Sequence, residues 1–413
     1  MKLTAISEHF LPRVGGTTHY VCETCRALSE SGVDVHLLVP GPQPKGVDVS
    51  DLPYAVSWID AGYPEAGDPS RQSRYEFCEL VNERVLSRTK AGEVDVVHVL
   101  FGLFVMEVLD TNAVRAAGAN TVATVHNLPP LECGRTWSGD PLSAQARDAL
   151  RLRAVAWKNN ARLRRHRYDT YITPSEQVAA ALKHVLSEAN INPVAHGISE
   201  DLVSRMAPPL SRRPAGGEPV RLLTLGGWMP HKRQHIIPDI ASRLVDAGID
   251  FQWRVAGPAG RLAGYKDSVD AILEARGLTG KVSTSGAVPF PDLPALYDAA
   301  HLYVQPSTEE GFCITALDAA AGGLPVIASP AGALPDICTV SGGTLVPSDP
   351  DAIAGAIIAH VERDDDNDDP RSVADRTKSR FSWEKSALAV LATYGKRKIT
   401  PGQSSALLLA ERS

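Results

Sequence analysis

The chain has 413 residues, of which 44% are hydrophobic and 22% are charged, and its formal net charge is −6. This length exceeds what one compact core usually takes, so two domains are expected, and the acidic balance argues against a nucleic-acid-binding protein, which would carry a basic face. A nucleotide ligand is not excluded, because a phosphate needs only a few local hydrogen-bond donors.

No segment is apolar over the roughly 20 residues that a membrane-spanning helix requires. The first residues, MKLTAISEHF, run directly into strand-like sequence and lack the apolar core of a secretion signal. We therefore expect a cytoplasmic protein.

In the first half of the chain, short segments rich in Val and Ile alternate with longer amphipathic segments. Buried strands are predicted at 33–40, 94–100, 121–128 and 170–175. Apolar strands without alternation, separated by helices, indicate a parallel sheet that is covered on both faces. This half, residues 1–205, is predicted to form one Rossmann-like domain.

A second domain is predicted after a Pro-, Gly- and Arg-rich linker at 206–219. The same alternation then restarts and continues through residues 220–383, and the last residues, 401–413, are predicted to be a tail. Further strands are predicted at 221–227, 251–258, 281–288, 301–307, 324–330 and 342–347. The fold class is therefore α/β with two doubly wound domains, and ligands of such sheets bind at the carboxyl ends of the strands, here in the cleft between the two domains.

No metal site is predicted. Cys22 and Cys25 share a face of a predicted helix, but no second pair has metal-ligand spacing, so we interpret them as small apolar helix residues. The acidic run at 362–371 has no apolar framework around it, which favours a solvated loop.

The segment 308–330, TEEGFCITALDAAAGGLPVIASP, carries the strongest signal. A polar loop after a strand leads into a helix from about Cys313 to Ala321. The backbone N–H groups of Gly311, Phe312, Cys313 and Ile314 would lie at its positive end, which suits phosphate or sugar hydroxyls, with Glu310 at the mouth. Asp318 lies eight residues after Glu310 in the helix, where Asp is unfavourable, and two roles stay open for it: a ligand contact or a surface position.

Three weaker signals lie elsewhere. Gly15 and Gly16 open a helix after the first strand, which suits either a phosphate cradle or an ordinary turn. Lys232 and Arg233 are predicted to open a helix after a strand, where positive charge opposes the helix dipole unless an anion binds there; a solvated basic turn is the alternative. His126 is predicted to close a buried strand facing the cleft, and a structural role is the alternative for this lone histidine.

Together these pieces resemble the retaining glycosyltransferases of family 4, which have the GT-B fold. EEGFCITALDAAAGGLPVIAS resembles the family's Glu-x7-Glu region, and the resemblance covers nearly the whole chain. DVVHVL, TVHN, TPSEQVAAAL, AHGI, GGWMPHKR, VAGP and SGAVPFPDLPALYDAAHLYVQPS follow in the family's order, and FSWEKSALAVLATY resembles its final helix. That helix, about 384–400, would return to complete the first domain.

The resemblance implies transfer of a sugar from a nucleotide diphosphate sugar, with UDP or GDP expected, to an acceptor, and with retention of the anomeric configuration. It implies catalytic roles for His126 and Glu310 at the donor sugar and for Lys232 at the departing diphosphate. It also implies donor contacts at Gly15, Gly16, Arg233, Gly257, Ala287, Val288, Gly311, Phe312, Cys313, Ile314 and Asp318.

The implied chemistry is same-face attack without a metal, a cofactor or a covalent intermediate. Fixed cations and N–H dipoles stabilise the negative charge that grows on the leaving group, and one such donor contributes roughly 3 kcal/mol. We expect Lys232 to stand exposed in the cleft.

The sequence departs from the family at three points. Gly226 and Gly227 stand where the family has an Arg before the Lys, Asp318 replaces a Glu, and Asn127 stands where Asp is frequent. Because of these departures, the family's fine donor specificity does not carry over to this chain from the resemblance.

The acceptor is expected to be a small molecule held by the first domain, such as a natural product, a thiol or an envelope precursor. For the basic stretch 159–167 a solvated face is favoured over contact with a membrane or an anionic acceptor. Two other functions stay open: a sugar-nucleotide epimerase of the same fold and a non-catalytic sugar-nucleotide-binding protein.

Overall fold

The computed structural model describes residues 1–12, 15–64, 69–128, 141–165, 167–207, 212–214, 217–260, 262–363 and 369–395. Parts of the predicted linker 206–219, of the acidic loop 362–371 and of the helix expected at 384–400 lie outside the described residues, as does the whole predicted tail 401–413.

The first lobe is built on a seven-stranded parallel sheet with the strand order β3-β2-β1-β4-β5-β6-β7. The four strands predicted in this half of the chain are present, as is a strand at the strand-like N-terminus, and two further strands at 55–60 and 191–193 were not predicted. The strands are β1 (Lys2–Ser7), β2 (Asp34–Gly41), β3 (Ala55–Asp60), β4 (Val96–Phe101), β5 (Asn120–Thr124), β6 (Thr170–Thr173) and β7 (Ile191–Pro193).

The second lobe is built on a six-stranded parallel sheet with the order β10-β9-β8-β11-β12-β13. Five of its strands lie within a predicted range, and β8 begins one residue before the range predicted for it. The strands are β8 (Val220–Leu225), β9 (Phe251–Ala256), β10 (Val282–Ser285), β11 (Leu302–Gln305), β12 (Val326–Ala328) and β13 (Thr344–Leu345).

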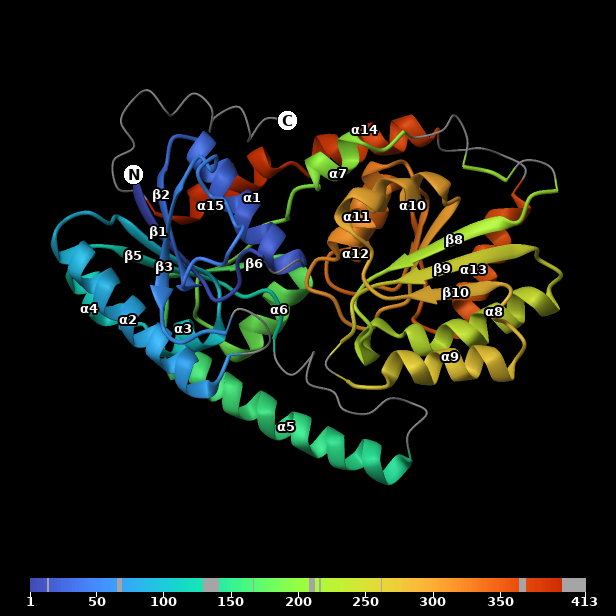
Figure 1. Cartoon of the computed structure of the whole chain (residues 1–413), viewed down its shortest axis with the longest axis horizontal. Helices are drawn as coiled ribbons and strands as arrows, with labels where there is room; N and C mark the ends of the chain where they lie inside the picture. Colours follow the sequence, from blue (N-terminus) through green and yellow to red (C-terminus); the bar gives the residue numbers. More distant parts are fainter. Residues whose placement is uncertain are drawn as a thin grey trace.

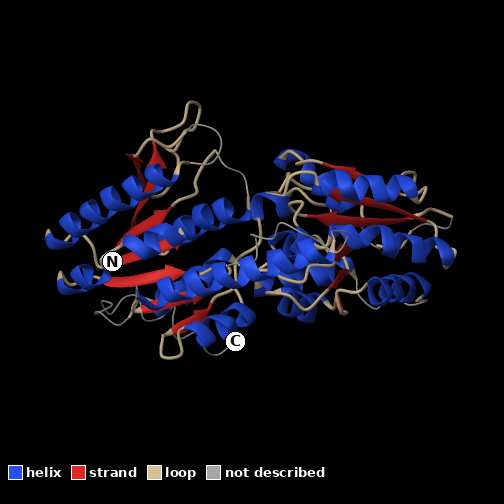
Figure 2. Cartoon of the chain, turned by 90° about the horizontal axis from the view of Figure 1, so that it is seen from below, coloured by secondary structure: helices blue, strands red, loops and turns tan. Residues whose placement is uncertain are grey.

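Helices cover both faces of each sheet, so that the two lobes stand side by side as three-layered units (Figures 1 and 2). In the first half of the chain they are α1 (Gly16–Glu30), α2 (Arg71–Lys90), α3 (Leu103–Val108), α4 (Thr111–Ala116), α5 (Leu142–Arg165), α6 (Glu176–Val185) and α7 (Glu200–Ser204). In the second half they are α8 (Ile237–Asp246), α9 (Tyr265–Ala275), α10 (Leu293–Ala299), α11 (Ile314–Ala321), α12 (Leu334–Ser341), α13 (Pro350–Glu362), α14 (Pro370–Arg380) and α15 (Trp383–Thr393).

Alternate residues of the strands supply separate cores on the two faces of each sheet. In the first lobe Leu37 belongs to one core and Leu38 to the other. In the second lobe Leu223 and Leu222 are divided in the same way. Two apolar faces explain why these strands appear in the sequence as continuous apolar runs rather than as alternating ones.

The last described helix, α15, packs on the first lobe against α1 (Figure 1). Tyr394 just beyond it receives a hydrogen bond from Asn120 at its carbonyl oxygen (2.8 Å), and its hydroxyl lies 2.8 Å from His98 Nδ1. A Cβ on Gly197 would overlap the backbone of Trp383, so the chain crosses here between the lobes with no room for a side chain. The two segments that join the lobes, one at Gly197 and one at Trp383, therefore pack against each other at this point.

The strand orders place a switch point between β1 and β4 in one lobe and between β8 and β11 in the other. At a switch point the chain leaves adjacent strands in opposite directions and opens a crevice at their carboxyl ends. The loops after β1, β8 and β11 carry Gly15, Lys232 and Glu310, so predicted site residues of both lobes lie at these crevices.

Candidate active site

Lys232 and Glu310 form an ion pair at the switch point of the second lobe. Lys232 Nζ donates to both carboxylate oxygens of Glu310, at 2.7 and 2.6 Å. β8 and β11 are hydrogen-bonded neighbours, so the loops that follow them meet at the same sheet edge. The pair is enclosed, because the side chains are 16% and 5% exposed. The expectation that Lys232 stands exposed in the cleft is therefore wrong.

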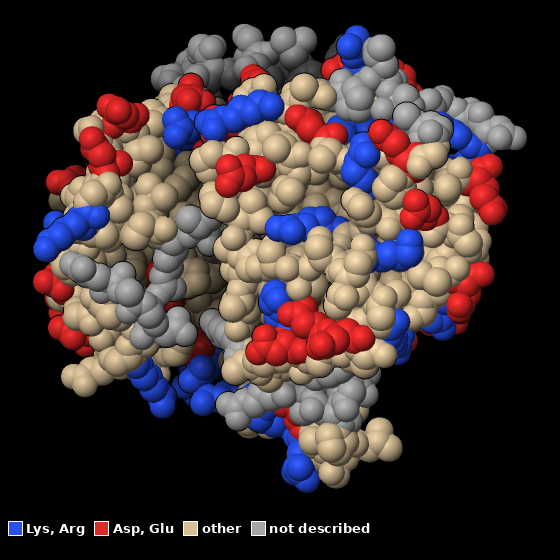
Figure 3. Space-filling model, turned by 45° about the vertical axis from the view of Figure 1, so that its right-hand side comes forward, with Lys and Arg blue, Asp and Glu red and all other residues tan. Residues whose placement is uncertain are grey.

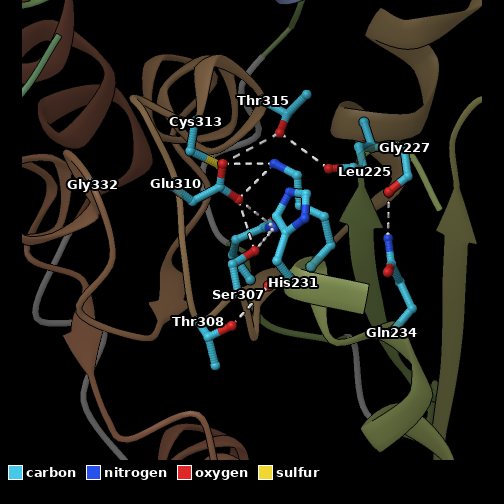
Figure 4. A network of polar contacts seen from close by, with 12 residues as sticks. Leu225, Gly227, His231, Gln234, Ser307, Thr308, Glu310, Cys313, Thr315 and Gly332 are labelled. Carbon is cyan, nitrogen blue, oxygen red and sulfur yellow. Dashed lines mark hydrogen bonds and ion pairs between the residues drawn. The ribbon is translucent and has the colours of Figure 1, made fainter. Parts of the chain in front are cut away.

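Two neighbours that the sequence analysis did not single out fix the carboxylate of Glu310. Ser307 Oγ donates to Glu310 Oε1 at 2.7 Å (Figure 4). Gln305 Nε2 donates to the same oxygen at 3.2 Å. The ammonium and the two neutral donors thus hold this carboxylate in one orientation. The signal was present in QPSTEEG, where polar residues directly follow a buried strand.

Lys232 does not open a helix, contrary to the sequence prediction. It ends a short 3-10 turn, Pro230–Lys232, and α8 begins only at Ile237. Proline stands in the first turn of each of these two elements, where its missing N–H costs nothing, and Arg233 between them is left-handed with φ 59°. The charge of Lys232 is thus balanced by Glu310 and does not oppose a helix dipole.

Arg233 lies on the side of α8 and α9 rather than in the hydrogen-bonded set around Glu310. Its charge helps to lower the pKa of His235 to about 4, after burial, which is the larger cause. Its Nε is buried without a hydrogen-bond partner among the described atoms. Among the described residues, Arg233 makes no contact that would make it a substitute for the family's Arg, whose positions are occupied by Gly226 and Gly227.

Helix α11 begins at Ile314, one residue after the predicted start. Cys313 before it adopts φ 80°, a left-handed conformation that is strained for a residue with a side chain. Phe312 is buried and stacks on His196 at 4.5 Å between ring centroids. The side chains of this loop thus face the core, and a ligand would meet the backbone N–H groups at the helix N-terminus.

The N-terminus of α1 in the first lobe faces that of α11. Gly16 is the first residue of α1, and a Cβ built on it would lie 3.6 Å from Ile314 Cδ1. Two positive helix ends therefore converge across the interface between the lobes, with Gly15 and Gly16 on one side and Gly311 to Ile314 on the other. Such an arrangement suits an anion that reaches both lobes.

His126 lies in the loop after β5 and not in the strand, which ends at Thr124. Its Nε2 donates to the carbonyl oxygen of Leu100 at 2.9 Å, and burial lowers its pKa to about 4. The ring packs on Tyr20 at 4.6 Å. His126 is therefore neutral near pH 7, with Nδ1 left as an acceptor.

The lobes touch where Gly311 meets His126. A Cβ on Gly311 would lie 2.5 Å from the carbonyl oxygen of His126 and 2.6 Å from Asn127 Oδ1. Gln177 of α6 accepts a hydrogen bond from the N–H of Gly332 at a second point of contact. Only a residue without a side chain fits at 311, because the opposing atoms include backbone.

Asp318 is buried and bound to the segment that crosses between the lobes. Ser199 donates to both carboxylate oxygens, with its N–H at 2.9 Å and its hydroxyl at 2.8 Å. His19 Nε2 lies 3.2 Å from the same hydroxyl. Burial raises the pKa of Asp318 to about 7 in spite of these bonds. Each carboxylate oxygen of Asp318 thus already accepts a hydrogen bond from within the chain. Of the two roles that the sequence left open for Asp318, the surface position is wrong.

Gly257, Ala287 and Val288 follow β9 and β10. Gly257 donates its N–H to Gly286 at 3.1 Å, and a Cβ on it would overlap the carbonyl of Gly226. Ala287 is exposed and Val288 is half-buried. These three residues lie at the same edge of the sheet as Lys232, but they follow β9 and β10, whereas Lys232 follows β8.

Across the described ranges, His, Cys, Asp and Glu side chains form no group of three or more that could hold a metal ion. None of the described helices has the length and apolarity that crossing a bilayer would take.

Comparison with known families gives a match for each half of the chain. The family Glycosyltransferase Family 4 matches residues 14–202, and the family Glycosyl transferases group 1 matches residues 219–363. D-inositol 3-phosphate glycosyltransferase 1 of Catenulispora acidiphila is 25% identical over 402 residues, which are 92% of this chain and 90% of that protein. The MMP alpha-(1->4)-mannosyltransferase of Mycolicibacterium hassiacum is 23% identical, with 96% and 98% of the two chains covered.

Solved structures agree on the fold. Sucrose-phosphate synthase from Thermosynechococcus elongatus superposes with a TM-score of 0.72 at 22% identity over 99% of both chains. Anabaena HepE in complex with UDP-glucose superposes with a TM-score of 0.64 at 16% identity, over 95% of this chain and 99% of that one. Both lobes of the chain and their order thus match, and the chain belongs to the family 4, group 1 glycosyltransferases of the GT-B fold.

Proposed function

We propose that this protein transfers a sugar from a nucleotide diphosphate sugar to a small hydroxyl-bearing acceptor with retention of the anomeric configuration. The donor binds between the lobes, with its diphosphate at the second lobe and its sugar near His126. The observation that carries the proposal is the enclosed Lys232–Glu310 pair beside the N-terminus of α11, opposite the N-terminus of α1.

The positive charge at this place would act on the leaving group. Breaking a glycosyl–phosphate bond leaves negative charge on the diphosphate, and Lys232 and the amides at the two helix ends are fixed in advance to stabilise it. Glu310 and the neutral His126 would accept hydrogen bonds from sugar hydroxyls. Same-face attack, with the donor phosphate taking the acceptor proton, needs no nucleophile from the chain.

Relatives suggest the first substrates to test. One relative is named as GDP-mannose-dependent, and a structural neighbour holds UDP-glucose, so GDP-mannose and UDP-glucose come first. Inositol phosphate is the first acceptor, since the relative that covers 92% of this chain is named for it.

A thermal-shift panel of UDP-, GDP-, ADP- and dTDP-sugars tests donor binding. A donor at one hundred times its Kd should add about 2.7 kcal/mol to the free energy of unfolding. Transfer with the identified donor is then followed by NMR of the new anomeric centre. An inverted product would overturn retention, and a glycosylated Glu310 or Asp318 trapped during turnover would overturn the direct mechanism.

The two alternatives give different products. An epimerase converts a donor into a new sugar nucleotide with no acceptor present, whereas a binding protein leaves every donor intact. A donor that stays unchanged alone and loses its sugar only when an acceptor is added supports the transferase.

A further inference from the structure

Helix α5 is exposed along most of its length. Within it only Asp148 and Leu163 are buried. Leu142, Leu150 and Trp157 are 83%, 66% and 75% exposed, the three highest values among large apolar side chains in the described part of the chain. Single exposed apolar residues are ordinary, but three on one helix indicate a surface that has a partner.

These three side chains lie on one side of the helix. At 100° per residue, positions 142, 150 and 157 fall within an arc of about 80° and span about 22 Å along the axis. The opposite side contacts the first lobe, where Arg162 pairs with Glu107 at 2.9 Å. Arg151 and Asp148, on that same side, pair with each other at 2.7 Å within the helix. The apolar stripe therefore faces away from the protein.

Exposed cations accompany the stripe. They are Arg147, Arg153, Lys158, Arg164 and Arg165. In total α5 carries six Arg and one Lys against one Asp, a formal charge of +6 in a chain of net charge −6. Lys and Arg side chains gather along the lower edge of the molecule in Figure 3, the edge where α5 lies in Figure 1.

We propose that α5 binds the surface of an anionic lipid bilayer and lies parallel to it. Leu142, Leu150 and Trp157 enter the boundary between headgroups and acyl chains, while the long Arg and Lys side chains reach the phosphates. A second copy of this helix would meet its own charge of +6, which opposes an apolar dimer. A neutral protein groove would leave the cations without counter-charges.

The apolar stripe on α5 was not predicted from the sequence. The basic stretch 159–167 was expected to form a solvated face, and its Arg162 is in fact paired with Glu107. The apolar stripe comes instead from residues 142–157, which the periodicity of charge alone does not reveal. The proposal does not depend on which donor or acceptor the protein uses.

Sedimentation of the full chain with vesicles tests the proposal. We expect the protein to pellet with vesicles that contain phosphatidylglycerol and to stay in solution with phosphatidylcholine alone, and added salt should release it because the Debye length shortens. The double variant L150A/W157A and the charge-reversal variant R153E/K158E should each weaken binding about tenfold or more.

The matched control is K45E/K90E, which changes the net charge equally at two exposed lysines outside α5 and should leave binding unchanged. Equal loss of vesicle binding in this control would overturn the assignment to α5. Retention of an oligonucleotide in place of anionic vesicles, or a dimer that L150A/W157A dissociates, would also overturn it.

Discussion

The ammonium of Lys232 lies within 2.7 Å of both oxygens of Glu310 and ties the loops after β8 and β11 together. The carboxylate is 5% exposed, so it depends on this cation and on its two neutral donors for its charge to be tolerated. The same pair that shapes the second lobe thus supplies the cation for the proposed chemistry.

Removal of this cation should affect both activity and stability. We expect Lys232→Ala to lower turnover about 100-fold or more, because the leaving group loses its cation. It should also lower the free energy of unfolding by about 3–5 kcal/mol, because Glu310 is left as a buried unpaired charge. Urea denaturation and initial rates measure the two effects.

The double variant Lys232→Ala/Glu310→Gln separates the effect on stability from the effect on turnover. It should regain most of the stability that Lys232→Ala loses, and none of the turnover. Wild-type turnover in Lys232→Ala would remove Lys232 from the mechanism.

Gly311→Ala should separate closure of the lobes from folding. Its methyl group would meet the His126 carbonyl and Asn127 side chain, so the lobes could not approach fully, and turnover should fall about tenfold or more while each lobe keeps its core. Gly355→Ala on α13 is the matched change, because nothing lies within 4 Å of its Cβ position. It should raise the free energy of unfolding by about 0.5–1 kcal/mol with full turnover. Equal turnover in the two variants would contradict the contact.

The His126 imidazole gives a test of atom position. His126→Gln can keep a donor to the Leu100 carbonyl but loses the acceptor at Nδ1. If that acceptor contacts the sugar, turnover should fall about tenfold or more with little change in the unfolding free energy. A variant with full turnover would assign His126 to packing alone.

The raised pKa of the Asp318 carboxyl predicts that the stability of the protein depends on pH. Its pKa is raised from 3.8 to about 7, so between those values the folded protein holds a proton that the unfolded chain has released. The stability from this protonated form is complete below about pH 4 and is lost as the pH rises through about 7.

In Asp318→Asn this loss is absent, so the variant should gain stability relative to the wild type by up to about 4 kcal/mol between these limits. Buried histidines such as His19 and His126 have lowered pKa values and act in the opposite sense, but they are common to both proteins and cancel in the difference. Urea denaturation from pH 4.5 to 8 measures this difference, and a constant one would contradict the raised pKa.

The sheets could be predicted because continuous apolar runs between amphipathic segments leave few other folds. Strands β3 and β7, the two edge strands of the first sheet, were missed. The three residues of β7, which end in Pro193, carry little pattern of their own and pair only along an existing edge. The loop and helix at 308–321 were placed within one residue at the helix start, because a polar loop between a buried strand and a small-residue helix is a local signal.

Contacts between segments that lie far apart in the sequence leave no local signal in it. Ser199 donates to Asp318 across 119 positions, and Gln177 reaches Gly332 across 155. Neither partner is unusual in its own neighbourhood, so only the crossing of the chain between the lobes brings them together.

The sequence by itself determined the two α/β lobes and the residues at their strand ends, because period and polarity are properties of neighbouring residues. The tertiary structure alone decided that Lys232 is enclosed by Glu310, that Asp318 turns to Ser199 and that α5 leaves Trp157 uncovered. Burial and pairing depend on what other parts of the chain supply, and that is fixed only when the lobes have packed.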